Sequence, residues 1–300
     1  MHILVSGASG LIGSHLVPEL LRAGHTVGRL VRDKSKLGDY DVLWNPREPI
    51  DSNLVSQFDA IVHLAGRNIG STRWSEEQAR EVFDSRVLGT RMVAEAAARA
   101  FADKGRRMVM VSASAVGYYG SRGDEMLTED SAPGTGYLAE TSVAWEAATS
   151  AAENAGVRVV MLRTGLVLAK EGGALPRMLK PFRLGVGGRM ASGRHYWPWI
   201  HIDDVVGVIV TALFNERLRG PINVVVPGAP RNSEFTQALA EVLKRPAVFV
   251  VPKFAGRLML GSIADDILFS SQRVVPKRLG ELPYTFRFPG LRDALRDLVG

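Results

Sequence analysis

The sequence contains no cysteine among its 300 residues. Disulfides, thiolate metal ligands and a cysteine nucleophile are therefore excluded. No apolar run approaches the roughly 20 residues that a membrane-spanning helix requires. The first residues, Met1 to Ser6, lack the basic and long apolar regions of a secretory signal. These absences predict a cytoplasmic protein with no membrane partner.

A strong excess of one charge is also missing. Lys and Arg number 37 against 31 Asp and Glu, which gives a net charge of +6. The densest basic groups are short pairs such as Lys277-Arg278, too small to indicate a nucleic-acid surface. Two acidic residues, Asp203 and Asp204, follow His201, but their spacing is not that of a metal site. We expect neither nucleic acid nor metal, while the mild basic excess suits a ligand that carries phosphates.

Short apolar runs alternate with longer helical patterns over the first 165 residues. The runs are apolar throughout rather than alternating, which is typical of parallel strands buried on both faces. The pattern predicts an α/β fold with a Rossmann-type doubly wound parallel sheet. The predicted strands are 3–5, 26–31, 41–44, 60–64, 108–111 and 157–162, and the predicted helices are 11–23, 75–102 and 136–155.

The pattern changes after Gly165, where glycine-rich loops precede weaker elements. It predicts a Rossmann domain over 1–165 and a smaller α/β substrate or lid domain over 166–300, from which the chain weaves back to the sheet. Helices are expected near 205–214 and 234–243, the first capped by Asp203 or Asp204. Strands are expected near 223–226 and 248–251.

A glycine-rich turn follows the first predicted strand and opens a helix, with G-x-x-G-x-x-G spacing. The three glycines would serve the tight turn, the approach of the backbone to a pyrophosphate, and close packing of helix on strand. The pyrophosphate would lie on free N–H groups at the helix N-terminus. This context predicts a dinucleotide site formed by Gly7, Ser9, Gly10, Leu11, Ile12 and Gly13.

The end of the second strand should contact the adenosine ribose. Arg32 lies there, about 20 residues beyond the glycine turn, and a guanidinium can hold a phosphate by two parallel hydrogen bonds. Arg32 therefore predicts NADP(H). If the strand register slips by one residue, Asp33 would meet the ribose hydroxyls and favour NAD. A solvated loop of mixed charge is the remaining alternative.

Several segments together resemble extended short-chain dehydrogenases/reductases, and more narrowly the atypical "epimerase family" group. The segments are the glycine turn, 59–66, 111–120, Trp145-Glu146, 199–204 and 271–279, the last in a C-terminal region typical of the group and of unassigned role. The resemblance covers essentially the whole chain. It implies that the cofactor is contacted by Leu64, Ala65, Gly66, Glu81, Arg86, Ser112 and Ala113.

The catalytic positions of the family are only partly matched. In these enzymes a Tyr in a Tyr-x-x-x-Lys motif moves a proton, the Lys lowers the pKa of that Tyr, and a Ser binds the substrate oxygen. Ser114 and Tyr137 match the family positions, whereas Thr141 stands where the Lys belongs. The pKa of an unperturbed tyrosine is near 10. The replacement of the lysine by Thr141 therefore removes the group that would lower the pKa of Tyr137 for acid–base catalysis.

Three alternatives follow from the missing lysine. Arg163 or Arg122 could supply the charge in space, or Glu140 or Tyr118 could act as acid or base instead. In the third alternative the protein binds NADP(H) as a sensor or structural protein with little turnover. The resemblance thus implies an epimerase-like protein or carbonyl oxidoreductase with an unidentified small-molecule substrate. A homodimer through helices 75–102 and 136–155 is expected if these faces are not simply monomeric surface.

Overall fold

A seven-stranded parallel sheet forms the centre of the computed structural model, which describes residues 1–70, 74–105 and 107–299. Its strands are β1 (His2–Ser6), β2 (Thr26–Val31), β3 (Val42–Leu43), β4 (Ala60–His63), β5 (Val109–Ala115), β7 (Arg158–Thr164) and β11 (Gly220–Val224). They lie in the order β11-β7-β5-β4-β1-β2-β3. The chain order reverses between β4 and β1, and ligands of open α/β sheets bind at such a point.

Two layers of helices cover the sheet, and neighbouring strand residues serve different layers. Ile3 and Val5 pack into a core with α1 and α7, while Leu4 packs into a second core with α3 and α5. This two-sided burial explains why the strand runs are wholly apolar. The helices of these layers are α1 (Leu11–Arg22), α3 (Glu76–Lys104), α4 (Tyr137–Ala147), α5 (Ser150–Asn154) and α7 (Ile202–Phe214).

The predicted α/β fold is confirmed, but the helix expected over 136–155 is divided into α4 and α5. The break lies at Thr149, whose side-chain hydroxyl donates to the Glu146 carbonyl oxygen at 2.7 Å. Such local side-chain bonds compete with the backbone ladder of a helix.

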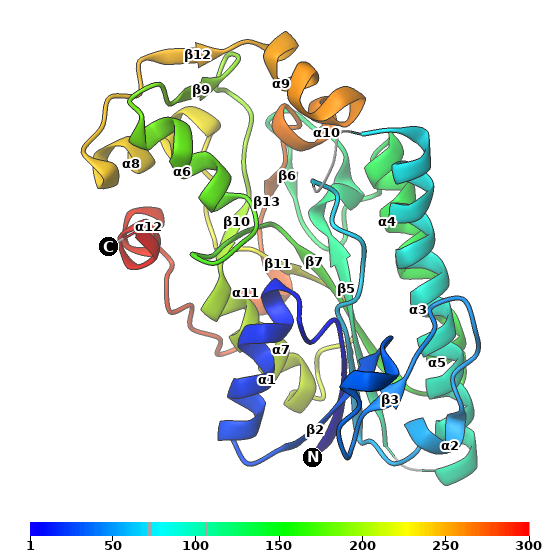
Figure 1. Ribbon diagram of the computed structural model, residues 1–300. Helices are drawn as coiled ribbons and strands as arrows, with labels where there is room; N and C mark the ends of the chain where they lie inside the picture. Colours follow the sequence, from blue (N-terminus) through cyan, green and yellow to red (C-terminus); the bar gives the residue numbers. More distant parts are fainter. Residues whose placement is uncertain (71–73, 106, 300) are drawn as a thin grey trace.

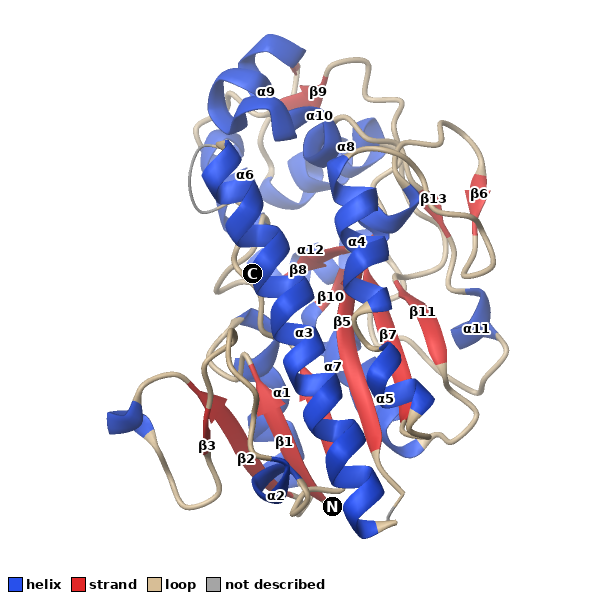
Figure 2. Ribbon diagram, turned by 90° about the vertical axis from the view of Figure 1, so that its right-hand side faces the viewer, coloured by secondary structure: helices blue, strands red, loops and turns tan. Residues whose placement is uncertain are grey.

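Most of the chain after residue 165 forms a second lobe at the carboxyl end of the sheet (Figures 1 and 2). It contains short two-stranded parallel sheets and helices. Residues 220–224 leave this lobe again to form β11 at the edge of the main sheet. The short elements outside the main layers are η1 (Lys34–Lys36), α2 (Ser52–Val55), η2 (Val116–Tyr119), β6 (Met126–Leu127), β8 (Leu166–Leu168), α6 (Leu175–Arg183), β9 (Gly188–Met190), β10 (Trp199–His201), α8 (Asn232–Leu243), β12 (Phe249–Val251), α9 (Lys253–Leu260), η3 (Gly261–Ile263), α10 (Ala264–Leu268), β13 (Arg273–Val274), α11 (Lys277–Gly280) and α12 (Leu291–Val299).

The start of α7 differs from the sequence-based expectation. His201, and neither Asp203 nor Asp204, is the N-cap, because its Nδ1 accepts a hydrogen bond from the Asp203 N–H at 3.1 Å. The Asp204 carboxylate instead accepts the backbone N–H groups of Arg287 and Phe288 at 2.6 and 3.0 Å. It thereby anchors the C-terminal segment to α7. Of the helices in the described ranges, none has the length and apolarity needed to cross a membrane.

Candidate dinucleotide and catalytic site

The glycine turn brings the backbone of β1 against the segment that follows β4. Gly7 has a φ of +67°, and a Cβ there would lie 2.9 Å from the Ala65 nitrogen. A Cβ at Gly13 would overlap the Gly7 carbonyl oxygen. Gly10 precedes α1 without a side-chain cap among the described residues, so first-turn N–H groups stay available to an anion. The cradle fits a dinucleotide pyrophosphate.

Ser6 and His63 support this cradle from below, and the sequence analysis did not single them out. The Ser6 Oγ accepts the N–H groups of Leu64 and Ala65 at 3.1 and 3.2 Å. It also lies 2.7 Å from the His63 Nδ1, so its own proton goes to that nitrogen. Burial lowers the pKa of His63 to about 4, which keeps the ring neutral. Both residues are polar and end apolar strands, and Ser6 lies directly beside His63 in the register of β1 and β4. Their position at the ends of two predicted strands is the feature of the sequence that could have indicated them.

Arg32 and Asp33, the two candidates for contact with the adenosine ribose, have different surroundings. The Asp33 carboxylate caps η1 by accepting the Ser35 N–H at 3.0 Å and hydroxyl at 2.7 Å, and these bonds lower its pKa. Arg32 is exposed and makes no hydrogen bond or ion pair with the rest of the described chain. The Arg32 donors thus have no partner within the described chain, whereas Asp33 is held by Ser35.

Arg86 lies beside the predicted cofactor segment. A Cβ on Gly66 would be 3.7 Å from the Arg86 guanidinium carbon, and the guanidinium lies 5.0 Å from the Trp145 ring centre. Its Nη1 donates to the carbonyl oxygens of Arg67 and Val82 at 3.0 and 3.1 Å. Burial lowers the pKa of Arg86 to about 10, which still leaves it charged at neutral pH. The other α3 candidate, Glu81, pairs with Arg67 at 2.9 Å.

Tyr137 begins α4, and its side chain points towards α3. Its hydroxyl donates to the Ala79 carbonyl oxygen at 2.5 Å, and its ring meets Trp74 edge-on at 5.3 Å. Burial raises the pKa of Tyr137, and the Thr141 side chain and then the positive charge of Arg86 oppose that rise. Of the two arginines suggested from the sequence, Arg122 instead pairs with Glu125 at 2.7 Å.

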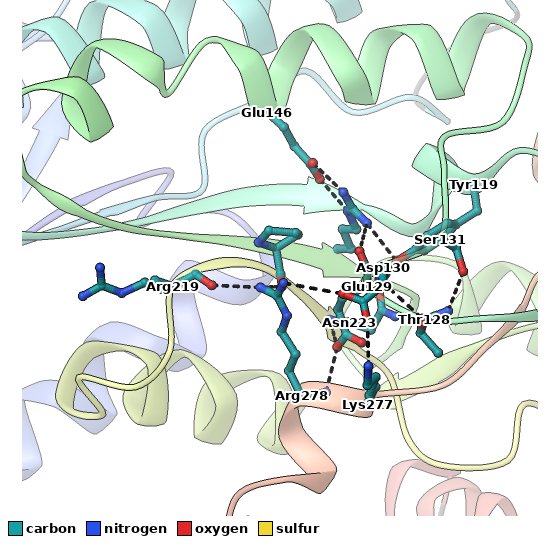
Figure 3. A network of polar contacts seen from close by, with 12 residues as sticks. Tyr119, Thr128, Glu129, Asp130, Ser131, Glu146, Arg219, Asn223, Lys277 and Arg278 are labelled. Carbon is teal, nitrogen blue, oxygen red and sulfur yellow. Dashed lines mark hydrogen bonds and ion pairs between the residues drawn. The ribbon is translucent and has the colours of Figure 1, made fainter.

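Ser114 is hydrogen-bonded to Glu146, which belongs to a buried charged network at the ends of β5, β7 and β11. Figure 3 shows Glu146, Tyr119 and Asn223 of this network. The Ser114 hydroxyl donates to Glu146 at 2.6 Å, and Arg163 holds both oxygens of the same carboxylate at 2.8 Å. Arg163 also donates to the Tyr119 hydroxyl at 3.0 Å, which donates to Asn223 at 2.7 Å. Burial alone would lower the pKa of Arg163, but Glu146 raises it above its usual value.

The predicted site residues thus fall into two groups. The glycine turn, Leu64 to Gly66 and Arg86 lie together, with the exposed Ser9 and Gly10 at the turn itself. Ser112 is buried on β5, where its hydroxyl donates to the Ala113 carbonyl oxygen at 3.3 Å. No described hydrogen bond joins Ser114 to Tyr137, since each hydroxyl donates elsewhere. Glu146 and Asn223, which the sequence analysis gave no catalytic role, complete the network around Ser114.

This combination of fold and glycine cradle has a family match. Residues 3–226 match the model of the NAD dependent epimerase/dehydratase family, and residues 251–298 match a domain of unknown function, DUF1731. The chain belongs to the NAD dependent epimerase/dehydratase family.

Individual relatives resemble the chain along its whole length. The epimerase family protein Mb2239 of Mycobacterium bovis is 38% identical over 98% of this chain and 96% of its own. The crystal structure of human epimerase family protein SDR39U1 (isoform2) with NADPH superposes with a TM-score of 0.89 at 33% identity, covering 99% of each chain. The crystal structure of a nucleoside-diphosphate sugar epimerase from Corynebacterium glutamicum superposes with a TM-score of 0.82 at 33% identity, covering 99% of this chain and 58% of that one.

Proposed function

We propose that this chain binds NADP(H) and uses it to reduce or epimerise a small molecule at a carbonyl or hydroxyl carbon. Residues 1–165, with β11, would hold the dinucleotide, and 166–300 would contact the substrate. The observation that carries the proposal is the position of Arg86 beside Gly66, where a Cβ would lie 3.7 Å from its guanidinium carbon, and its charge opposes the rise in the pKa of Tyr137. The human relative crystallised with NADPH supports the choice of cofactor.

The residues that would hold the cofactor follow from the contacts described above. The first-turn N–H groups of α1 would hold the pyrophosphate, favoured by the helix dipole. Arg32 would pair with the 2′-phosphate, because its guanidinium is exposed while Asp33 is engaged in capping η1. NADPH, when bound, supplies the reducing equivalent. Arg86 would keep a positive charge beside Tyr137, in the role that Thr141 cannot fill.

Cofactor choice is tested by fluorescence titration with NADPH and NADH. We expect tighter binding of NADPH, and Arg32→Ala should weaken it by about tenfold to a hundredfold, as is usual for hydrogen bonds to charged groups. NADH binding should stay unchanged. Arg22→Ala is the matched control, since Arg22 is exposed on α1 and, among the described residues, forms an ion pair with Glu19 alone. Equal losses for both cofactors would contradict the role of Arg32.

Reduction is tested by following NADPH oxidation with a panel of aldehydes and ketones. Epimerisation consumes no net NADPH, because the hydride that NADP⁺ takes up is returned, and it is tested by following the conversion of a panel of nucleotide sugars in the presence of NADP⁺. For any substrate that turns over, Tyr137→Phe should lower kcat by about a hundredfold, the usual size of acid–base assistance. Arg86→Gln should lower kcat as well, and Arg86→Lys should restore part of it because the charge returns. Ser85→Ala, a neighbouring change on α3, should leave kcat close to that of the wild type.

A second candidate function is cofactor binding without turnover, as in a sensor of the NADP(H) pool. It is favoured by the hydroxyl protons of Tyr137 and Ser114, which are both donated within the protein. Tight NADPH binding with neither NADPH oxidation nor conversion of a nucleotide sugar across the panels would select this candidate. A kcat unaffected by Tyr137→Phe would instead remove Tyr137 from the reaction while leaving catalysis in place.

A further inference from the structure

Large apolar side chains gather, exposed, at the far end of the second lobe. We call this surface the apolar tip. It comprises Leu184, Val186, Val248, Phe249, Val250, Phe254 and Leu258. Val248, Phe254 and Leu258 are 77%, 73% and 71% exposed, respectively. Single exposed apolar residues need no explanation, but a group of this size on one end of a molecule marks an interaction site.

The members of the apolar tip come from adjoining elements. Strand β12 pairs with β9, so Phe249 lies beside Gly188, and the Ala191 N–H donates to the Val251 carbonyl oxygen at 2.8 Å. The chain then runs directly into α9. Figures 1 and 2 both place β9 and α9 at the end of the molecule opposite the N-terminus. The ribbon and the helix therefore form one end surface.

Helix α9 turns Phe254 and Leu258 outward. Its inner face is marked by Gly256, where a Cβ would lie 2.9 Å from the Phe269 ring. Phe254 and Leu258, at i and i+4, share one face of the helix. At about 100° per residue they lie opposite Gly256. Their exposure thus follows from the way α9 packs, because turning them inward would expel the face that contacts Phe269.

The segments that form the apolar tip contain no carboxylate. Neither 172–202 nor 242–264 has an Asp or Glu, although the chain as a whole has 31. The same segments carry Arg177, Lys180, Arg183, Arg189, Arg194, Lys244, Arg245, Lys253 and Arg257. Of these, Arg257 pairs with Asp265 at 2.9 Å, and Arg177 donates to the Gly70 carbonyl oxygen at 2.5 Å. Arg183, Arg189, Arg245 and Lys253 are exposed.

We propose that the apolar tip docks onto the surface of an anionic phospholipid bilayer. Protruding Phe, Leu and Val side chains partition into the boundary between headgroups and acyl chains, and Lys and Arg around them attract anionic headgroups. Charge argues against a second copy of the chain, which would bring the same basic residues face to face. The expectation of no membrane partner rested on the absence of a spanning segment, which does not bear on a surface contact.

The experiment is flotation of the full chain with vesicles of phosphatidylcholine alone and of phosphatidylcholine mixed with phosphatidylglycerol. We expect binding to the mixed vesicles only, weakened by added salt. Phe254→Ser with Leu258→Ser, and separately Arg245→Glu with Lys253→Glu, should each lower the affinity by about tenfold or more. The matched controls are Leu21→Ser on α1 and Arg107→Glu, at positions 54% and 90% exposed. Both should bind as the wild type does.

Circular dichroism and the unfolding midpoint of each variant establish that it is folded before its binding is compared. Absence of binding to either vesicle would overturn the proposal, as would equal binding by the tip variants and the controls. So would a wild-type dimer in sedimentation velocity that Phe254→Ser with Leu258→Ser converts to a monomer, because a second copy would then cover the surface. None of these outcomes depends on NADP(H), so failure here is separate from failure of the proposed function.

Discussion

The carboxyl edge of the sheet has two halves that use polar residues in opposite ways. Around β1 and β4, the polar groups are neutral, with Ser6 and His63 supporting a backbone cradle kept open by Gly7. Around β5, β7 and β11, the polar groups include a full charge pair, Glu146 with Arg163, enclosed by protein. The first half leaves donors for a ligand, and the second half satisfies its donors internally.

This difference indicates how the two halves depend on a bound cofactor. The first half would be completed by a phosphate of the proposed cofactor, since the N–H groups at the start of α1 lack a side-chain cap among the described residues. In the second half, Ser114, Arg163 and Tyr119 each donate a hydrogen bond to a partner in the protein. Changes in the second half should therefore act on folding, and changes in the first half on both folding and cofactor binding.

The largest expected loss of stability comes from removing one partner of the buried ion pair between Glu146 and Arg163. Arg163→Met leaves Glu146 without its cation, and removal of one partner of a buried pair costs about 3–5 kcal/mol. Urea unfolding of the purified variant measures the loss. Arg163→Met combined with Glu146→Leu should recover most of it, because no charge is then left unpaired. Arg107→Met, which breaks the exposed pair with Glu216, should cost at most about 1 kcal/mol.

Two glycine-to-alanine substitutions, at Gly7 and Gly24, distinguish the cost of backbone strain from the cost of a steric clash in the glycine turn. Gly7 and Gly24 both have positive φ, +67° and +79°, but a Cβ at Gly24 meets no atom within 4 Å. Gly24→Ala should cost about 1–2 kcal/mol of stability from strain alone. Gly7→Ala should cost about 3 kcal/mol, since a Cβ would also push on Ala65. It should abolish NADPH binding in the fluorescence titration, whereas Gly24→Ala should not.

Acid should weaken the neutral half through His63. Its pKa of about 4 in the folded protein lies below the usual histidine value of 6.5, so the unfolded state binds the proton first. The stability it confers is present above pH 6.5 and is lost as the pH falls towards 4. Between pH 7 and pH 5 the loss from this residue should be about 2 kcal/mol. Urea unfolding at both pH values should show a smaller difference for His63→Gln, and an unchanged difference would contradict the assignment.

The sheet and the glycine turn could be predicted from the sequence because their signals are local. Apolar runs define the strands, and the glycine spacing lies within a single strand–turn–helix unit. The partners of Ser114 and Tyr137 could not be predicted in the same way. Ser114 meets Glu146 across 32 positions, and Tyr137 meets Ala79 across 58. Only the packing of α4 against β5 and α3 decides which groups those hydroxyls reach.

The positive charge that affects Tyr137 could not be predicted from the sequence either. The sequence predicts a compensating charge from Arg163 or Arg122, brought close by the fold. The positive charge that opposes the rise in the pKa of Tyr137 is that of Arg86, on α3. Arg86 was expected to contact the cofactor, but its effect on Tyr137 depends on how α3 lies along α4. The spacing of residues within one helix predicts which face is packed, but not which residues of the other helix that face contacts.

The return of the chain to β11 has a consequence for synthesis on the ribosome. This edge strand hydrogen-bonds to β7 only after residues 165–219 have been made, and it brings Asn223 to the Tyr119 hydroxyl. Until then β7 presents an open strand edge, which is a template for aggregation. A nascent chain that stops near residue 165 would therefore be an unfinished sheet and a substrate for chaperones, rather than an independently folded half.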